Sequence, residues 1–200
     1  MCGRYYIDTN WLDEIGNVVY SFDIDWKICK EQFQGDILPT NTAPIIEKTE
    51  HGLQLSLCKW GFPLQKGKNL VINARAETVL SKPSFRDSIR HCRCVIPAAG
   101  FYEWNKANER VSFTMPQSKI LYMAGIWQPT AKDNQFTILT TSPNASVLPV
   151  HDRMPLVLMP EEVMPWIQDF GAAEKLLTKI PPLLEHKQEY EQLSLFTNSA

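Results

Sequence analysis

The sequence predicts an α+β protein: a single domain with a curved, mostly antiparallel, barrel-like β-sheet and helices at its periphery. Many short segments alternate apolar with polar residues, and only a few show helical spacing. The two kinds of segment do not alternate regularly, which argues against a parallel βαβ sheet. With 200 residues, 44% of them hydrophobic and 21% charged, the chain can bury one substantial core. Because no internal repeat or long linker divides the sequence, we expect residues 1–200 to form one domain.

Short alternating runs predict the strands. Leucines alternate with polar residues from position 53 to position 57, for example, so one face of that segment is apolar. Strands are expected at residues 3–7, 53–60, 70–75, 93–96, 101–104, 111–115, 121–127, 136–141, 155–159 and 193–196. The prolines Pro39 and Pro44 predict a loop over residues 35–44.

Helical spacing and end signals predict the helices. Asn10 is a candidate N-cap, and apolar residues follow it at helical spacing. Further helical segments are expected at residues 77–80, 84–90, 161–169 and 172–179. Pro165 is expected to delay or kink the third of these segments, because proline lacks the backbone N–H. The polar residues 185–192 are expected to be a solvated surface.

The charge balance limits how this chain can bind nucleic acid. The formal net charge is −2 and the sequence pI is about 6.1. A protein of this charge does not coat nucleic acid through its overall field. Binding would instead require individual arginines gathered in a cleft.

Cysteine usage and the N-terminus indicate a reducing compartment. The count of five cysteines is odd and their spacing is not that of a disulfide framework. The N-terminus lacks an apolar signal core, and no apolar run is long enough to span a bilayer. We therefore expect a cytoplasmic enzyme or binding protein. Cys92 and Cys94 lie beside His91 but have no second ligand pair, so buried thiols are favoured over zinc and no metal or cofactor is expected.

Cys2 follows the initiator methionine directly. A small second residue is the usual condition for removing Met1, which would leave an α-amine and a thiol on one residue. Such a 1,2-aminothiol attacks an aldehyde twice, first forming a Schiff base and then a five-membered thiazolidine. The α-amine has a pKa of about 7.7–8.0 against about 10.4 for lysine, so much more of it is unprotonated near neutral pH.

Three further residues are candidates for proton transfer or orientation. Glu103 lies between two aromatic residues, where desolvation would raise its pKa into the range of a general acid. His151 could shuttle protons near neutral pH, and Asn73 offers both a donor and an acceptor. Taken singly, each also fits a duller interpretation as a surface glutamate, a core histidine and a turn asparagine.

A repeated spacing strengthens the functional interpretation. Residues two apart on an extended chain share one face, and an arginine follows three of the candidates at that spacing. The pairs are Cys2 with Arg4, Asn73 with Arg75, and His151 with Arg153. If these faces converge, reactive groups and guanidinium groups share one pocket, as chemistry on a sugar in a nucleic-acid backbone requires.

The chain resembles the SOS response-associated peptidase family, also described as abasic-site processing proteins. The segments that carry the resemblance span nearly the whole chain in order and approximate spacing: MCGRY at 1–5, LPTN at 38–41, KWGFP at 59–63, NARAET at 73–78, CVIPA at 94–98, GFYEW at 100–104 and HDRMP at 151–155. The resemblance implies a self-processed N-terminus and a thiazolidine crosslink to the abasic sugar. It also implies single-stranded DNA containing abasic sites as the partner, with no metal cofactor.

The same resemblance implies roles for particular residues. Cys2 would be the nucleophile, Asn73 would position the sugar or the amine, and Glu103 and His151 would transfer protons. The residues expected to contact DNA are Arg4, Arg75 and Arg153 at phosphates, together with Pro39, Thr40, Trp60 and Phe62. For Trp60 and Phe62, a place in the core is an equally good interpretation.

Two rival functions remain open at this point. One is a cysteine-type peptidase or amidohydrolase in which Cys2 attacks an amide and His151 is its base. The other is a non-enzymatic module that only binds single-stranded DNA. In the favoured function, the protein acts as a nucleoid-associated monomer that shields the lesion, with lyase activity as a side reaction.

Overall fold

The computed structural model describes residues 2–8, 15, 21–22, 33–63 and 70–189. Apart from Ile15, which is helical, the helix predicted after Asn10 lies outside these ranges, as does the strand predicted at 193–196. The strands are β1 (Arg4–Ile7), β2 (Ser21–Phe22), β3 (Gly35–Ile37), β4 (Thr42–Thr49), β5 (Gly52–Trp60), β6 (Phe62–Pro63), β7 (Leu70–Val71), β8 (Asn73–Arg75), β9 (Arg93–Ala98), β10 (Gly100–Trp104), β11 (Arg110–Thr114), β12 (Leu121–Gln128), β13 (Gln135–Thr141), β14 (Met154–Pro155), β15 (Val157–Leu158) and β16 (Glu185–Glu189). The helices are α3 (Pro83–His91), α4 (Pro160–Gln168) and α5 (Phe170–Leu176).

The larger sheet curves until it closes on itself. Its strands follow the order β13–β12–β9–β4–β5, and each of these neighbours pairs antiparallel. A parallel pairing of β5 with β13, at Trp60 and Phe136, then closes the ring. The interior is apolar, because strand alternation directs every second side chain inward. The predicted α+β class with a curved, barrel-like sheet is therefore confirmed.

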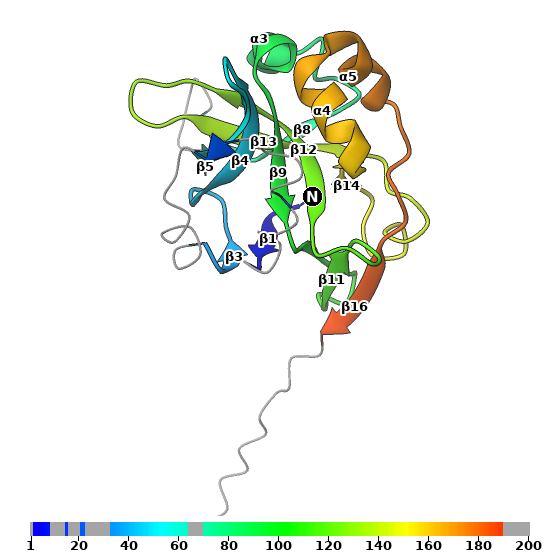
Figure 1. Cartoon of the computed structure of the whole chain (residues 1–200). Coiled ribbons are helices and arrows are strands. Elements are labelled where there is room, and N and C mark those ends of the chain that lie inside the picture. The colour runs from blue at the N-terminus through cyan, green and yellow to red at the C-terminus, as the bar shows by residue number, and fades with distance from the viewer. Residues whose placement is uncertain (1, 9–14, 16–20, 23–32, 64–69, 190–200) are drawn as a thin grey trace, which may run out of the picture.

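A second sheet, in the order β16–β11–β10–β1–β3, lies beside the ring (Figure 1). Its inner face carries the fully buried rings of Tyr5, Phe101 and Phe113, which face one another across β1, β10 and β11. Glu103 lies two residues beyond Phe101 on the same strand and therefore also points inward. Gly100 lets the strands approach closely, because a Cβ there would lie 2.5 Å from the Phe113 carbonyl oxygen.

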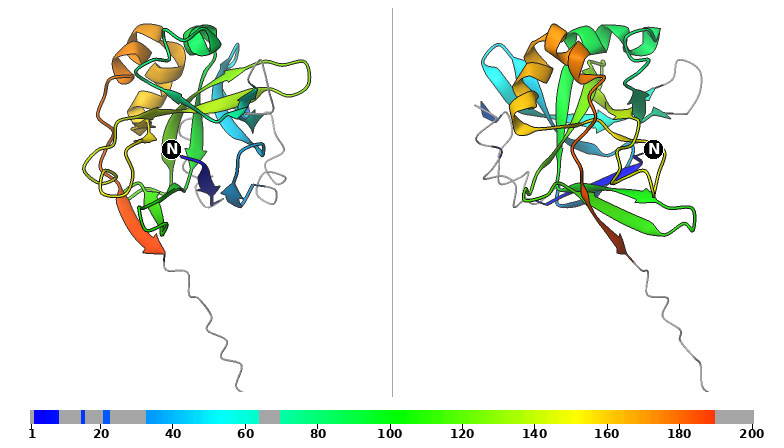
Figure 2. Two further views of the ribbon diagram at one scale, coloured as in Figure 1. Left: turned by 180° about the vertical axis from the view of Figure 1, so that it is seen from behind. Right: turned by 90° about the vertical axis from the view of Figure 1, so that its right-hand side faces the viewer.

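The helices α3, α4 and α5 gather at one end of the molecule, away from β11 and β16, as the views of Figure 2 show. Arg93 holds two of them, because its guanidinium donates to the carbonyl oxygens of Ile89 and Arg90 in α3 and of Trp166 and Ile167 in α4. These helix ends leave carbonyls without intrahelical partners, so one buried cation satisfies both. No helix within the described ranges is long and apolar enough to cross a membrane.

The loop predicted over residues 35–44 is wrong at both ends. Residues 35–37 form β3, and β4 begins at Thr42, so only residues 38–41 turn. Pro44 is accommodated because β4 pairs with β5 there but with β9 only at Ile46 and Glu47. A proline is tolerated in a strand where its missing N–H has no ladder partner.

Other elements differ more modestly from the prediction. Residues 77–80 form turns rather than a helix, and the polar stretch predicted as solvated surface begins with β16, an edge strand paired with β11. α4 starts at Pro160 and continues through Pro165. α5 starts at Phe170 because the Asp169 carboxylate accepts from the N–H groups of Gly171 and Ala172.

Candidate functional site

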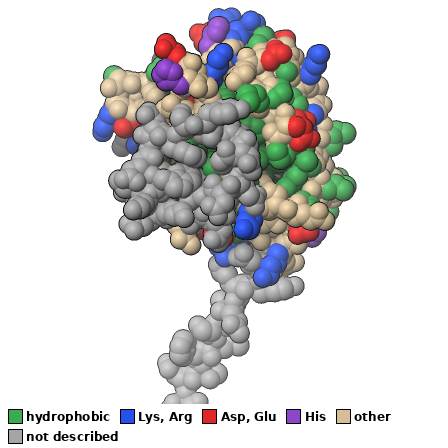
Figure 3. Space-filling view, viewed as in Figure 1, with side chains coloured by type: hydrophobic (Ala, Val, Ile, Leu, Met, Phe, Trp, Pro, Cys, Tyr) green, Lys and Arg blue, Asp and Glu red, His purple; other side chains and the backbone are tan. Residues whose placement is uncertain are grey.

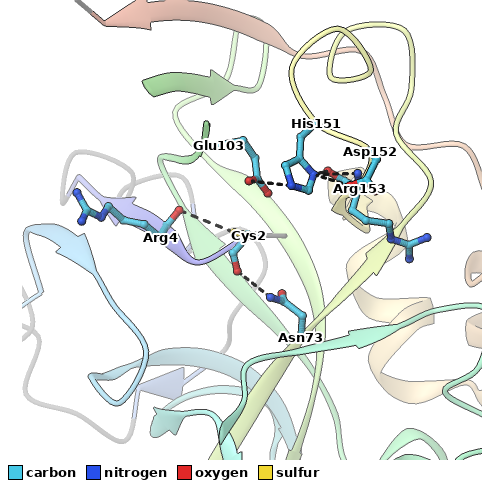
Figure 4. A network of polar contacts seen from close by, with 7 residues as sticks. All are labelled: Cys2, Arg4, Asn73, Glu103, His151, Asp152 and Arg153. Carbon is cyan, nitrogen blue, oxygen red and sulfur yellow. Dashed lines mark hydrogen bonds and ion pairs between the residues drawn. The ribbon is translucent and has the colours of Figure 1, made fainter. Parts of the chain in front are cut away.

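The four residues predicted as catalytic converge on one site (Figure 4). The Asn73 side-chain amide, at the start of β8, donates to the Cys2 carbonyl oxygen at 2.8 Å. His151, between β13 and β14, places Nε2 at 3.7 Å from Oε2 of Glu103 on β10. Glu103 is also close enough to act electrostatically on the Cys2 thiol. Residues from three parts of the sequence thus surround the beginning of β1.

Cys2 is fully buried, and its thiol is a poor source of thiolate. Burial raises the thiol pKa strongly, and the negative charge of Glu103 raises it further. The positive charge at the amino terminus and a weak hydrogen bond to the Arg4 carbonyl, at 3.8 Å, offset only part of this. The Sγ atom therefore stays protonated near neutral pH.

Asn73 holds the backbone of Cys2 through its side-chain nitrogen, and its side-chain oxygen is left for another donor. β8 pairs in parallel with β13, so Asn73 lies opposite Ile138 at the edge of the ring. Its Oδ1 atom is buried and has no hydrogen-bond partner among the described residues. A buried acceptor of this kind is costly unless something binds it, which suits a site that receives a donor from a ligand.

Glu103 is 3% exposed at the inner face of β10. Burial raises the pKa of its carboxyl, and the positive charges of the amino terminus and of His151 oppose that effect. A carboxyl with a raised pKa keeps its proton at higher pH than usual, so it can act as a general acid. The sequence predicted that the Glu103 carboxyl is desolvated, and its burial confirms this.

His151 follows a turn whose backbone holds it in place, since its N–H donates to the Val147 carbonyl at 3.0 Å. Nδ1 lies 3.0 Å from the Arg153 backbone nitrogen and 3.2 Å from the Arg153 carbonyl oxygen. With the shorter contact made as a hydrogen bond from the Arg153 N–H, the proton of the neutral ring is assigned to Nε2, on the side of Glu103. The exposed Asp152 carboxylate lies 3.1 Å from Nδ1. Carboxylates therefore lie near both ring nitrogens, an arrangement that suits a ring exchanging protons.

The three predicted phosphate contacts differ in availability. Arg75 is exposed at the end of β8, whereas the Arg4 side chain is 31% exposed, beside Asp36 at 3.5 Å. Arg153 instead forms a two-pronged ion pair with Glu77, at 2.7 and 2.9 Å. Figure 4 shows Arg4 and Arg153 on opposite sides of Cys2. In Figure 3 basic and acidic side chains are interspersed over the coloured part of the visible face.

Pro39 and Thr40 form the tight turn between β3 and β4. Thr40 has a φ of 77°, an uncommon conformation for a β-branched residue. It is held there because its N–H donates to the Trp60 carbonyl at 2.9 Å and the Asn41 side chain accepts from the Leu38 N–H at 2.9 Å. The turn is exposed at Leu38, Thr40 and Asn41 and partly exposed at Pro39.

Comparison with known proteins identifies the family. The family model described as SOS response associated peptidase (SRAP) matches residues 1–197. The chain belongs to the SRAP family. The abasic site processing protein YoaM of Bacillus subtilis is 29% identical, over 100% of this chain and 93% of that protein. The abasic site processing protein YedK of Escherichia coli is 25% identical, over 84% of this chain and 80% of its own length.

A solved structure shares the fold of this chain. A crystal structure of a Bacteroides thetaiotaomicron protein has a TM-score of 0.78 and 22% sequence identity, and the match covers 94% of this chain and 91% of that one. The resemblance inferred from the sequence motifs is thus confirmed at the level of family and fold. The curated relatives named above carry abasic-site processing in their names.

Two residues of the SRAP motifs belong to the core and not to a DNA surface. The Trp60 ring is 0% exposed, lies between Tyr5 and Phe136, and donates from Nε1 to the Ile72 carbonyl at 2.9 Å. Phe62 is 3% exposed and packs near Phe85. Neither ring has a free face for a base. The expected DNA contact of these residues is therefore corrected to a role in packing.

The sequence prediction missed a surface on the outer face of the smaller sheet. Tyr6, Tyr102 and Trp104 alternate with the inward residues of β1 and β10. Tyr6 and Trp104 are partly exposed there, whereas Tyr102 is only 9% exposed because it packs against Tyr6 and Arg110. The guanidinium of Arg4 lies 5.5 Å from the centroid of the Trp104 ring, and that of Arg110 lies 4.9 Å from the Tyr102 centroid. The alternation in GFYEW around Glu103 was the signal that could have revealed this outer face.

Cys92 and Cys94, the pair beside His91, differ in burial. Cys94 is buried in β9 and Cys92 is half-buried just before it. Within the described parts of the chain, no three His, Cys, Asp or Glu side chains are grouped to hold a metal ion. Burial raises the pKa of both thiols, which keeps them protonated.

Proposed function

We propose that this SRAP protein captures abasic sites in single-stranded DNA by forming a thiazolidine between Cys2 and the ring-opened sugar, after Met1 is removed. The observation that carries the proposal is the hydrogen bond from Asn73 to the Cys2 backbone beside the Glu103–His151 pair. In the proposal, Asn73 fixes the backbone of Cys2, and Glu103 and His151 transfer the protons that its nitrogen and sulfur exchange during the reaction. The abasic-site processing names of the relatives support the same substrate.

The α-amine acts before the thiol in this proposal. The Cys2 thiol is buried, and its raised pKa leaves little thiolate near neutral pH. The amine of a processed Cys2 has an ordinary pKa of about 7.7–8.0, so a substantial fraction is unprotonated. The amine therefore supplies the first nucleophile, and the thiol needs to react only once the aldehyde carbon is bound beside it.

The steps balance as a condensation. The Cys2 nitrogen adds to the aldehyde carbon, and the resulting carbinolamine loses its hydroxyl as water when Glu103 or His151 delivers a proton. Sγ then adds to the carbon of the protonated imine, and its proton passes to the carboxylate or imidazole left behind. The net reaction joins aldehyde and aminothiol with loss of one water. Ring closure removes the imine that would otherwise promote β-elimination and strand cleavage, so lyase activity is a side reaction.

The DNA strand binds through few charges and two partly exposed aromatic rings. Arg75 is exposed and contacts a phosphate directly, whereas Arg4 must exchange its partner Asp36 for a phosphate and Arg153 is paired with Glu77. The rings of Tyr6 and Trp104 on the outer face are partly exposed, so unpaired bases can stack on them. Pro39 and Thr40 lie on the turn between β3 and β4. This surface suits single-stranded DNA. The protein would act where single-stranded DNA is exposed in the nucleoid.

A cysteine hydrolase is the second candidate, and the environment of the thiol argues against it. Peptide hydrolysis needs a thiolate nucleophile, which enzymes obtain by lowering the thiol pKa. At Cys2, burial and the Glu103 charge do the opposite. Self-removal of Met1 would be a single turnover and does not require a free thiolate at equilibrium.

The test incubates an oligonucleotide containing one abasic site with the processed protein and with a preparation whose α-amine is acetylated. We expect a complex that survives heating without reductant only for the free amine. Unrelated peptides are offered in parallel. An adduct from the acetylated protein would overturn the order of steps, and turnover of peptides without any DNA adduct would favour the hydrolase.

A further inference from the structure

Glu77 and Arg153 form an ion pair that joins two parts of the site. The Arg153 guanidinium donates to both Glu77 carboxylate oxygens, at 2.7 and 2.9 Å. The Arg153 side chain is only 14% exposed, whereas that of Glu77 is 45% exposed. A planar guanidinium and a carboxylate paired in this way have a fixed relative orientation. The guanidinium is thus engaged inside the protein, although the sequence suggested a phosphate contact.

The pair is anchored on the ring through Thr140. The Thr140 carbonyl oxygen accepts from Arg153 Nη2 at 2.6 Å and from the backbone N–H of Ala76 at 2.9 Å. One carbonyl in β13 therefore holds both the turn that follows β8 and the segment that precedes β14. Asn73 lies at the start of that β8 strand, and His151 lies in that segment.

The contact continues from Arg153 to the imidazole. The Arg153 backbone N–H donates to Nδ1 of His151 at 3.0 Å. While this bond holds, the neutral ring carries its proton on Nε2, which lies 3.7 Å from Glu103. The Arg153 carbonyl oxygen, 3.2 Å from Nδ1, is the acceptor that the other tautomer would use. A shift of Arg153 would free Nδ1 to take the proton, and the exposed Asp152 carboxylate, 3.1 Å away, would favour that form.

We propose that Glu77 is a positioning residue: through Arg153 it holds His151 in the orientation and tautomer whose Nε2–H is directed to Glu103. This inference rests on the proposed function, because it assigns His151 a proton-transfer role in forming the adduct. Glu77 does not touch the reacting atoms.

The ion pair persists over the pH range in which adduct formation is expected. The hydrogen bond from Arg153 lowers the pKa of the Glu77 carboxyl, and partial burial opposes this effect. A carboxyl whose pKa is lowered in the folded state stabilises the fold at neutral pH and loses that contribution as the pH falls through the lowered pKa. The ion pair of Glu77 with Arg153, which positions His151 in this proposal, is therefore formed near neutral pH.

The experiment compares Glu77→Gln with a matched control, Glu162→Gln. Glu162 forms another partly buried ion pair, with Lys179, at the start of α4. The tautomer of His151 is measured from its ring nitrogen shifts in ¹⁵N NMR, and adduct formation and binding to intact single-stranded DNA are measured separately. For Glu77→Gln we expect both neutral tautomers of His151, adduct formation slowed about tenfold, and unchanged affinity for intact DNA. Glu162→Gln should keep the wild-type tautomer and rate.

Three results would overturn the proposal. If Glu77→Gln binds intact DNA more tightly and reacts at the wild-type rate, Glu77 competes with phosphate for Arg153 instead of positioning His151. If both variants slow the reaction equally with the same tautomer, the effect is one of stability only. If Glu77→Gln keeps the Nε2–H tautomer, the chain of contacts does not control the ring. The NMR result stands even if the wild-type protein forms no adduct, so failure of the proposed function is distinguishable.

Discussion

Cys2 and Cys94 are both completely buried, and burial raises the pKa of both thiols, yet their surroundings are opposite in kind. Cys94 is the second residue of β9 and packs against Gly125, where a Cβ on the glycine would lie 3.2 Å from its sulfur. Cys2 lies at the start of a strand, beside an amide, a carboxyl and an imidazole. The difference teaches that a reactive sulfur here depends on its neighbours and on a terminal amine, since thiolate character is low at both sites.

The largest effect expected from this comparison is the loss of the adduct in Cys2→Ser. The serine amine can still form a reversible imine, but its hydroxyl closes the ring poorly. Heat-stable product should therefore disappear without reductant and return when borohydride reduces the imine. Denaturing gel electrophoresis after heating measures both results.

Cys94→Ala is the matched control for Cys2. We expect a wild-type yield of adduct and a free energy of unfolding lower by about 1 kcal/mol, because a small cavity opens in the core. If Cys94→Ala loses the adduct while staying folded, the contrast between the two cysteines is wrong.

Glu103→Gln should have the next largest effect, slowing adduct formation by roughly 10²–10⁴-fold, as expected for loss of a general acid. Because the pKa of the Glu103 carboxyl is raised, the general acid is lost only at higher pH, and the wild-type rate declines as the carboxyl ionises. At low pH the rate declines because the α-amine is protonated. Rates followed across pH should show the decline at high pH in the wild type and its absence in Glu103→Gln. A wild-type decline retained in the variant would assign it to another group.

The same substitution should stabilise the fold. Because the folded-state pKa of Glu103 is raised, its favourable contribution exists at low pH and is lost as the pH rises through that pKa. A neutral glutamine avoids burying a charge, so Tm should rise at about pH 8, by roughly 2–4 °C for each kcal/mol gained, and the advantage should shrink toward about pH 5. Thermal unfolding at the two pH values checks this; a lower Tm at the higher pH would show that ionised Glu103 stabilises the fold.

Sequence patterns located the site because reactive side chains at strand ends depend on local spacing. Asn73, Glu103 and His151 converge with Cys2 as predicted. The family motifs set these positions, and strand alternation placed Glu103 on the inner face of β10. The proton-transfer roles themselves stay predictions.

The remaining differences come from tertiary pairing, which local patterns do not encode. β4 was missed because Pro44 suggested a loop, although β9 pairs with the strand only beyond that point. β16 was missed because an edge strand can be polar on both faces. The partner of Arg153, Glu77, is 76 residues away in sequence, so no local pattern could show that this arginine is engaged.

The smallest expected effect concerns the exposed arginine Arg75 and its contact with a DNA phosphate. Arg75→Ala should weaken binding to single-stranded DNA and make the slope of log K against log[salt] less negative by about 0.7, the value for one lost phosphate contact. Arg86→Ala is the matched control, because Arg86 is also an exposed arginine and lies on α3, outside the elements that carry the site residues. Fluorescence anisotropy with an intact oligonucleotide measures both slopes. Equal slopes for the two variants would remove Arg75 from the DNA contact.

The chemistry assigned to Cys2 has a direct signature in intact mass spectrometry, before and after incubation with an oligonucleotide that holds one abasic site. The account predicts free protein lacking Met1, and an adduct whose mass is the sum of protein and oligonucleotide minus one water, formed without reductant. An adduct on protein that retains Met1, or no mass gain from protein whose Cys2 amine is free, would contradict it.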